Sequence, residues 1–244
     1  MKVLVIMGSL RKRNTYQTVK KIENILSENY EFEYVFLNEQ NIKNCRGCHL
    51  CISHGEDKCP LNDDRDLIIE KIEQSDGVIL ASPNYVMNVS WIMKNYIDRF
   101  AYTLHRPKFF NQNFMILITS GSKMGSKNAL KSLSVITSGG KITSKLRVFF
   151  TPGMKPKKIE LQERKIVRMA NKFGSSLSNK KEHNPPLAYL FWFSIFKGMS
   201  FKNKNEFIAD YEFYKDKDYF TEAELNIFQR VVVRFLTYIV RLAN

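Results

Sequence analysis

The chain has 244 residues, and its 44% hydrophobic and 25% charged residues give a composition that is ordinary for a soluble globular protein. Its net charge is +14, but the charge is spread along the chain and no nucleic-acid-binding motif accompanies it, so nucleic acid is not expected as a partner. We find no secretion signal and no apolar run long enough to span a bilayer. These observations predict a cytoplasmic protein.

Strand and helix patterns alternate over the first two thirds of the chain. Short runs of branched apolar residues predict five strands, and segments with helical spacing of apolar residues lie between and after them. The predicted strands are Lys2–Met7, Phe32–Leu37, Gly77–Ala81, Phe114–Thr119 and Ile142–Phe150. The predicted helices are Thr15–Leu26, Asp64–Gln74, Val89–Leu104, Lys127–Thr137 and Glu160–Phe173. This alternation predicts a doubly wound α/β fold, in which helices cover both faces of a five-stranded parallel sheet.

The remaining residues, 175–244, have a different composition. Residues 175–179 and 184–186 have the small and Pro-rich composition of a linker, and an aromatic stretch follows at 189–196. We expect the last helix to begin at a capping box formed by Thr221 and Glu224. The chain is therefore predicted to contain a domain over 1–174 and a helical C-terminal extension over 175–244. The extension is expected to pack on the domain or on a dimer partner, and peripheral contact with a membrane is the alternative.

The loop between the first strand and the first helix carries three short-range donors, Ser9, Asn14 and Thr15, and two positive charges, Arg11 and Arg13. A helix N-terminus offers unpaired N–H groups and the positive end of a dipole, and arginine binds phosphate bidentately, so this loop suits a phosphate. It matches neither the dinucleotide fingerprint nor the Walker A loop, which argues against a nucleoside triphosphate. The alternative is an ordinary polar turn.

Two further loops follow the third and fourth strands. Pro83, Asn84 and Tyr85 form a turn against which a planar ring system could lie, and Ser120 and Gly121 belong to a loop rich in hydroxyl groups. Ligands of doubly wound sheets bind at the carboxyl ends of the strands, where all three loops are expected to meet. Taken singly, each of these two loops is equally well explained as a polar turn.

The four cysteines of the chain lie within fifteen residues, as Cys45, Cys48, Cys51 and Cys59, and Pro60 follows the last one. Three thiols at this spacing and a fourth before proline are typical of ferredoxin-like [4Fe–4S] ligation. In a reducing compartment, clustered cysteines favour metal binding or catalysis over disulfide formation. The alternatives are a metal-free tight loop beside another cofactor, and a site for zinc or redox-active thiols.

Together these motifs resemble those of the flavodoxin-like NAD(P)H-dependent FMN reductases, in particular the branch related to iron–sulfur flavoproteins. The resemblance covers residues 1–150 and rests on four pieces in order. They are Gly8-Ser9-x-Arg11 with Asn14-Thr15, Cys45-x-Gly47-Cys48-x-x-Cys51, Cys59-x-x-x-Asp63-Asp64, and Ser82-Pro83-Asn84-Tyr85 followed by Lys94 and Asp98-Arg99. The phosphate loop has Arg13 where the family has glycine, which leaves the role of Arg13 open.

The resemblance implies a flavodoxin-like sheet, FMN as cofactor and NAD(P)H as electron donor. The electron acceptor would be a quinone, a small aromatic compound, free flavin or a protein, and the assembly a homodimer or higher homo-oligomer. The implied FMN phosphate ligands are Ser9, Arg11, Asn14 and Thr15; the isoalloxazine contacts are Pro83, Asn84, Tyr85 and Val86, with Ser120 and Gly121 on the other side. No acid–base residue is nominated, because the flavin supplies the hydride chemistry.

Two other functions stay open at this point. The first is an iron–sulfur flavoprotein that transfers electrons through a [4Fe–4S] cluster on Cys45, Cys48, Cys51 and Cys59. In the metal-free alternative that the resemblance also implies, the same loop shapes the flavin pocket or a subunit contact. The second is a binding or regulatory module that keeps the fold without the flavin.

Overall fold

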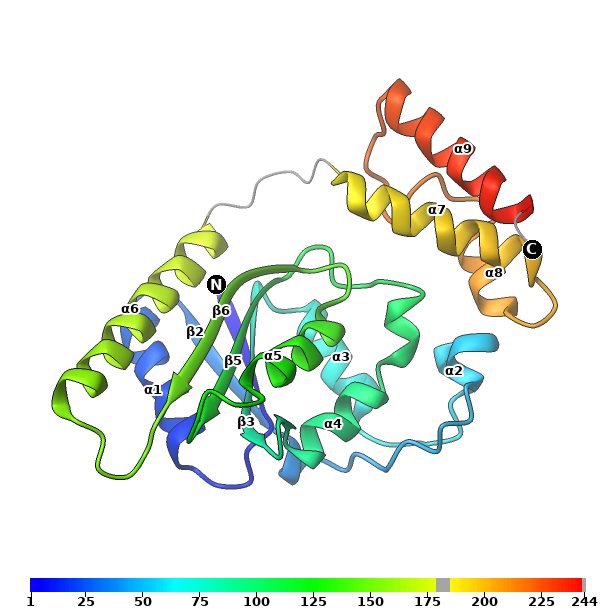
Figure 1. Ribbon diagram of the computed structural model, residues 1–244. Helices are drawn as coiled ribbons and strands as arrows, with labels where there is room; N and C mark the ends of the chain where they lie inside the picture. Colours follow the sequence, from blue (N-terminus) through cyan, green and yellow to red (C-terminus); the bar gives the residue numbers. More distant parts are fainter. Residues whose placement is uncertain (179–184, 243–244) are drawn as a thin grey trace. The chain divides into compact units, whose positions relative to one another are not determined.

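The computed structural model describes residues 1–178 and 185–242. One sheet of this part of the chain has its strands side by side in the order β2, β1, β3, β5, β6 (Figure 1). These strands are β1 (Lys2–Met7), β2 (Glu31–Phe36), β3 (Gly77–Tyr85), β5 (Asn113–Ser120) and β6 (Lys141–Phe149). Neighbours on this path are parallel, while the short β4 (Asn88–Val89) pairs antiparallel with the end of β3. If the five parallel strands are numbered in chain order, leaving β4 out, their order across the sheet is 2-1-3-4-5, which is the order of flavodoxin. The predicted flavodoxin-like sheet is therefore confirmed.

Helices cover both faces of the sheet (Figure 1). The helices α1 (Asn14–Leu26) and α6 (Pro156–Ser178) pack on one face, and α3 (Arg65–Glu73), α4 (Trp91–Asp98) and α5 (Ser126–Ser134) lie on the other. In the first layer, Val19 and Ile22 of α1 and Phe173 of α6 belong to the same buried cluster as Val3 and Val5 of β1. Because both faces are covered, the central strands are continuous apolar runs rather than alternating ones.

The described residues form two compact units. The first comprises residues 1–45, 63–100 and 108–178, which include the sheet, its helices and the 3₁₀ turns η1 (Leu37–Glu39) and η4 (Val135–Thr137). The second comprises residues 46–62, 101–107 and 185–242. Its elements are α2 (Leu50–Ser53), η2 (Glu56–Lys58), η3 (Ala101–Leu104), α7 (Leu187–Lys202), α8 (Ile208–Tyr214) and α9 (Ile227–Leu242). The domain division at residue 174, expected from the sequence, stays a prediction.

Several element boundaries differ from the predicted ones. The third strand continues past Ala81 to Tyr85, because Ser82 and Pro83 extend the ladder with β5 and the last two residues pair with β4. The helix expected over 89–104 is present but shorter, since residues 88–89 form β4 and α4 ends at Asp98. It starts only after Ser90, whose Oγ accepts a hydrogen bond from the N–H of Met93.

The ends of the expected linker also differ. Helix α6 begins at Pro156, a residue suited to the first helical position, and ends at Ser178, so residues 175–178 of the expected linker are helical. Asn179 and Asn184, which the linker prediction also included, lie outside the described residues.

The capping box at Thr221 is wrong, because α9 begins only at Ile227, directly after Asn226. The N–H of Gln229 donates to Oδ1 of Asn226 at 2.8 Å, and the N–H of Asn226 donates to Oε1 of Gln229 at 3.0 Å. This reciprocal pair is a capping box made of amides instead of a hydroxyl and a carboxylate. The helix therefore starts at a capping box, as predicted, but the box is at Asn226 instead of Thr221.

Candidate functional site

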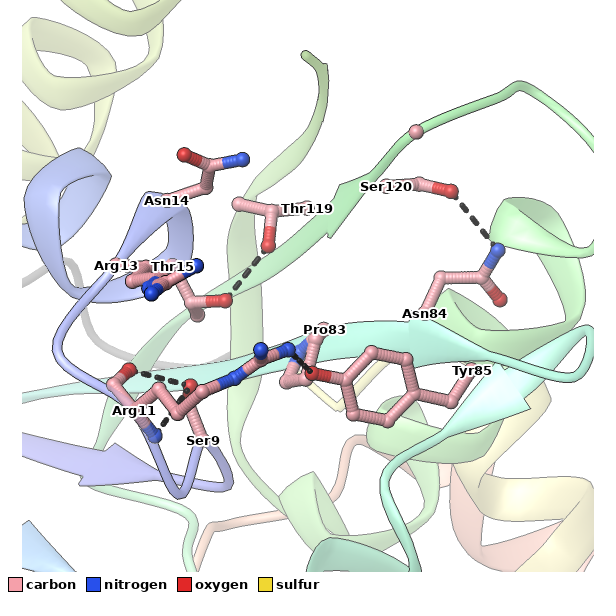
Figure 2. A pocket seen from close by; sticks show the side chains of 11 residues that line it. Ser9, Arg11, Arg13, Asn14, Thr15, Pro83, Asn84, Tyr85, Thr119 and Ser120 are labelled. Atoms are coloured by element: carbon pink, nitrogen blue, oxygen red, sulfur yellow. Dashed lines mark hydrogen bonds between the residues drawn. The ribbon is translucent and has the colours of Figure 1, made fainter. Parts of the chain in front are cut away.

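A pocket with a volume of about 220 Å³ lies where β1, β3 and β5 end (Figure 2). It is lined by residues from three loops, all of them in the first unit: Ser9, Arg11, Arg13, Asn14, Thr15, Pro83, Asn84, Tyr85, Thr119, Ser120 and Gly121. The structure therefore brings together every cofactor-contacting residue predicted from the sequence except Val86. Arg13 and Thr119 also line the pocket, although the sequence did not point to them as cofactor-contacting residues.

The loop after β1 is shaped by its own hydrogen bonds. The Oγ of Ser9 donates to the carbonyl oxygen of Arg11 at 2.8 Å and accepts from the N–H of Arg11 at 3.4 Å. Helix α1 starts directly after Arg13, and among the described residues no side-chain hydrogen bond caps it. The N–H groups of the first turn of α1 are therefore available to an anion, and two arginines line the same pocket.

The three loops are linked to one another across the pocket (Figure 2). Nη2 of Arg11 donates to the hydroxyl of Tyr85 at 3.1 Å, which joins the first loop to the second. The buried hydroxyls of Thr15 and Thr119 are 2.6 Å apart, which joins helix α1 to the end of β5. These bonds hold the positions of the pocket's polar groups.

One polar atom of the lining, Oδ1 of Asn84, is buried without a hydrogen-bond partner among the described residues. Nδ2 of Asn84 donates to Oγ of Ser120 at 2.9 Å and to the carbonyl oxygen of Met124 at 2.8 Å. A carbonyl oxygen can only accept, so this contact fixes the orientation of the amide. Oδ1 of Asn84 is then buried without a hydrogen-bond donor in the part of the chain that the structure describes. A buried acceptor without a donor costs about 1–3 kcal/mol.

Val86 lies at the tip of the β3–β4 hairpin and is 99% exposed. Val86 and Met87 have φ angles of 46° and 65°, a conformation that a β-branched residue rarely adopts. Gly125 approaches this tip so closely that an added Cβ would lie 2.2 Å from Cα of Met87. The strained tip is thus held against the loop after β5, and the predicted contact of Val86 with the isoalloxazine stays a prediction.

The cysteine loop runs from Cys45 to Cys59, and we call the flanking residues Lys43–Cys45 and Asp63 its stem. The stem is anchored at the end of α4, within the first unit. Arg99 forms a bidentate, fully buried ion pair with Asp63 and also donates to the carbonyl oxygen of Lys43 at 3.0 Å. Oδ1 of Asn95 accepts from the N–H of Cys45 at 3.0 Å. Asn95 of α4 and Arg99, the residue directly after α4, therefore hold both ends of the loop's stem.

The carboxyl group of Asp63 is the centre of this anchor. Burial alone raises its pKa, but hydrogen bonds from Arg99 and from the N–H groups of Lys43 and Arg65 outweigh burial. The net result is a pKa below the ordinary value of 3.8. Asp63 is therefore charged at neutral pH, as its role in the pair with Arg99 requires.

The tip of the loop is anchored separately, within the second unit. Arg106 donates to the carbonyl oxygens of Cys51 and Ile52 in α2 and forms ion pairs with Glu56 and with the buried Asp210 of α8. His105 contacts the other oxygen of Asp210 at 2.7 Å. The C-terminal helices thus hold the segment that carries Cys51.

The thiols differ in exposure and position. Cys45 and Cys48 are exposed, while Cys51 and Cys59 are half-buried. Cys45 belongs to the first unit and the other three belong to the second. Within the described residues, no group of three or more His, Cys, Asp or Glu side chains is arranged to hold a metal ion. The assignment of these cysteines as cluster ligands stays a prediction.

Residues 1–151 match the family model described as NADPH-dependent FMN reductase. The chain belongs to the NADPH-dependent FMN reductase family. It is accordingly an FMN-containing oxidoreductase that uses NAD(P)H, as the resemblance of its motifs implied. The nucleotide-phosphate chemistry of the first loop and the flavodoxin-like sheet are both consistent with this membership.

Similar proteins agree with this family. An iron–sulfur flavoprotein of Clostridioides difficile is 32% identical over 219 residues, which are 84% of this chain and 93% of that protein. One of Archaeoglobus fulgidus is 34% identical over 57% of this chain and 69% of its own length, and the matches to two further archaeal relatives span about half of those proteins (49% and 51%). The solved NAD(P)H:quinone oxidoreductase of Methanothermobacter marburgensis shares the fold, with a TM-score of 0.56 at 16% identity, covering 75% of this chain and 99% of that one.

Proposed function

We propose that FMN binds in the pocket at the ends of β1, β3 and β5 and passes electrons from NAD(P)H to a second acceptor. The observation that carries the proposal is the meeting of the uncapped N-terminus of α1, Arg11 and the Asn84–Ser120 pair in one pocket. The first two suit a phosphate. The third adds an amide and a hydroxyl to the lining, and such groups can hydrogen-bond to the polar edge of a heterocycle.

Each loop has a separate role in this proposal. Ser9, Arg11, Asn14 and Thr15 hold the phosphate, and Arg13 adds positive charge beside them. Pro83, Asn84, Tyr85 and Val86 line one side of the isoalloxazine, and Ser120 and Gly121 line the other. FMN, when bound, accepts the hydride and releases the electrons, so the side chains need only bind, orient and exclude water.

The acceptor follows from the chemistry of the flavin rather than from a residue of the pocket. Quinones, small aromatic compounds, free flavin and protein acceptors all accept electrons from a reduced flavin. A homodimer or higher homo-oligomer, and a location in the cytoplasm, stay predictions from the sequence.

A second candidate function is electron transfer through a [4Fe–4S] cluster on Cys45, Cys48, Cys51 and Cys59. Two observations favour it over an unspecified role for the loop. The loop is anchored at its stem by Arg99 and at its tip by Arg106, so its backbone is held in place at both ends. The relatives reported above are named iron–sulfur flavoproteins.

Anaerobic purification followed by an absorbance spectrum and iron and sulfide analysis tests both functions. The two bands of oxidised flavin with no iron support the FMN reductase alone. The same bands with a broad visible absorbance that bleaches on reduction, and with four iron atoms per chain as the proposed cluster requires, support the second function. A colourless protein that does not bind added FMN contradicts both.

A further inference from the structure

Helix α9 exposes a second apolar face that its packing in the second unit does not use. Its buried residues, Gln229, Val233 and Thr237, recur every four positions and lie on the side that packs against α7. The close approach of Gly198 in α7 to Val240 in α9 belongs to the same contact. The exposed face is a stripe of large apolar side chains, each between 59% and 66% exposed: Phe228, Val231, Phe235, Tyr238 and Leu242. Their spacing of three and four places them in one row along the helix.

The charged side chains of α9 and α7 all have one sign, while the acidic residues Asp216 and Asp218 lie near Lys197 of α7. Helix α9 contains Arg230, Arg234 and Arg241, which follow one another on a strip beside the exposed row, and it contains no acidic residue. The neighbouring helix α7 contains Lys197 and Lys202 and likewise no acidic residue. The pair of helices therefore combines exposed apolar side chains with positive charge alone.

Helix α7 adds the residue types that favour a membrane interface. Leu187, Phe191, Trp192 and Met199 are between 43% and 65% exposed. Tryptophan and phenylalanine on an apolar face, with arginine or lysine beside it, are typical of helices that lie in the headgroup region of a bilayer. No helix among residues 1–178 and 185–242 is long and apolar enough to cross a bilayer, so contact at the surface is the geometry that these helices allow.

We propose that the exposed apolar face of α9 docks on a bilayer that contains anionic phospholipid. A second copy in an antiparallel two-fold contact along the stripe would bring the arginine strips of both copies together, whereas an anionic surface is complementary to them.

Surface docking has a consequence for the choice of electron acceptor. A reductase held on a bilayer meets acceptors that partition into lipid, so quinones become favoured over water-soluble compounds. This consequence rests on the proposed function, whereas the docking itself does not. Vesicle binding can therefore be measured with protein that has no flavin, and its failure is distinguishable from failure of the reductase proposal.

The test is flotation of the purified full-length protein with vesicles of phosphatidylcholine alone and of phosphatidylcholine mixed with phosphatidylglycerol. We expect binding to the mixed vesicles, little binding to phosphatidylcholine, and loss of binding at high salt. The double variant Phe228→Ser/Phe235→Ser should reduce binding about tenfold or more. The matched control is Leu161→Ser on α6, which removes a side chain that is also 63% exposed and should leave binding unchanged.

Analytical sedimentation of the same proteins without vesicles tests whether a second copy of the chain, instead of a bilayer, covers the exposed face of α9. A wild-type dimer that the double variant converts to a monomer, with no vesicle binding by the wild type, would show that a second copy covers the stripe and overturn the proposal. Equal binding of both vesicle types would also overturn it. Because all the substituted side chains are exposed, circular dichroism should confirm that each variant stays folded.

Discussion

The pocket and the cysteine loop are positioned by different means. The pocket lies at the ends of parallel strands, within one unit, so the sheet itself brings its three loops together. The cysteine loop leaves the sheet and is held at two places by buried arginines, Arg99 at the stem and Arg106 at the tip. The position of the cysteine loop therefore depends on a few buried ion pairs. The position of the pocket depends on the sheet, and single pocket residues mainly change the affinity for the ligand.

The largest effect is expected from breaking the stem anchor with Asp63→Asn. This change leaves the buried Arg99 without its charge partner, which costs about 3–5 kcal/mol of the free energy of unfolding. Urea denaturation measures the loss. The matched control is Asp98→Asn, which breaks an exposed pair with Lys94 and should cost less than about 1 kcal/mol. Equal losses in the two variants would contradict the stem anchor.

The same anchor should depend on pH in one direction. The pKa of Asp63 in the folded protein lies below 3.8, so its contribution to stability is complete above that value. The contribution is lost as the pH falls through the lowered pKa. The difference in unfolding free energy between wild type and Asp63→Asn should therefore be constant near neutral pH and shrink in acid. A difference that shrinks already near neutral pH would show that Asp63 does not have a lowered pKa.

A smaller, local effect is expected at the tip from Asp210→Asn. Arg106 then loses its buried partner and holds the carbonyl oxygen of Cys51 less firmly. The rate of alkylation of Cys51, followed by mass spectrometry, should rise about tenfold if opening becomes easier by about 1.4 kcal/mol. Asp216→Asn on the exposed surface is the control. FMN binding should not change in either variant, and a loss of FMN in Asp210→Asn would argue against separate anchoring of the pocket and the tip.

The smallest effect is expected in the pocket, from Tyr85→Phe. The variant keeps the ring and removes only the hydroxyl that accepts a hydrogen bond from Arg11. Loss of one partly exposed hydrogen bond costs about 0.5–1.5 kcal/mol, so the dissociation constant for FMN should rise about two- to tenfold. Fluorescence titration of the apoprotein measures it. An increase of several hundredfold would mean that Tyr85 does more than orient Arg11.

The sequence predicted the sheet and the position of the three pocket loops, because both follow from the order of strands and turns along the chain. Apolar strand runs and the turns that end them located the sheet and the three loops, and parallel strands bring the ends of such loops together. Boundaries were less predictable, because Ser82 and Pro83 are typical of a turn yet continue β3 through pairing with β5. The start of α9 was missed because amide side chains of Asn226 and Gln229 replace the expected hydroxyl and carboxylate.

The anchors of the cysteine loop were beyond sequence reasoning for a different reason. Asp63 and Arg99 stand 36 residues apart and form their pair only through tertiary packing. Asp210 lies 104 residues from Arg106, in a region whose composition suggested only a helical extension. Thr119 could have been predicted as a pocket residue, because it stands at the end of a predicted strand. Its hydroxyl contacts that of Thr15 in the pocket.

The central claim, that the pocket binds the FMN phosphate, is tested most directly by the ratio of affinities for FMN and riboflavin. Calorimetric titration of the apoprotein should show a strong preference for FMN. In Arg11→Ala that preference should fall about tenfold or more, because a charge-assisted hydrogen bond contributes about 1.5–3 kcal/mol. Arg164→Ala, which changes an exposed arginine of α6, should keep the full preference. The same preference in wild type and Arg11→Ala would place the phosphate elsewhere and contradict the account.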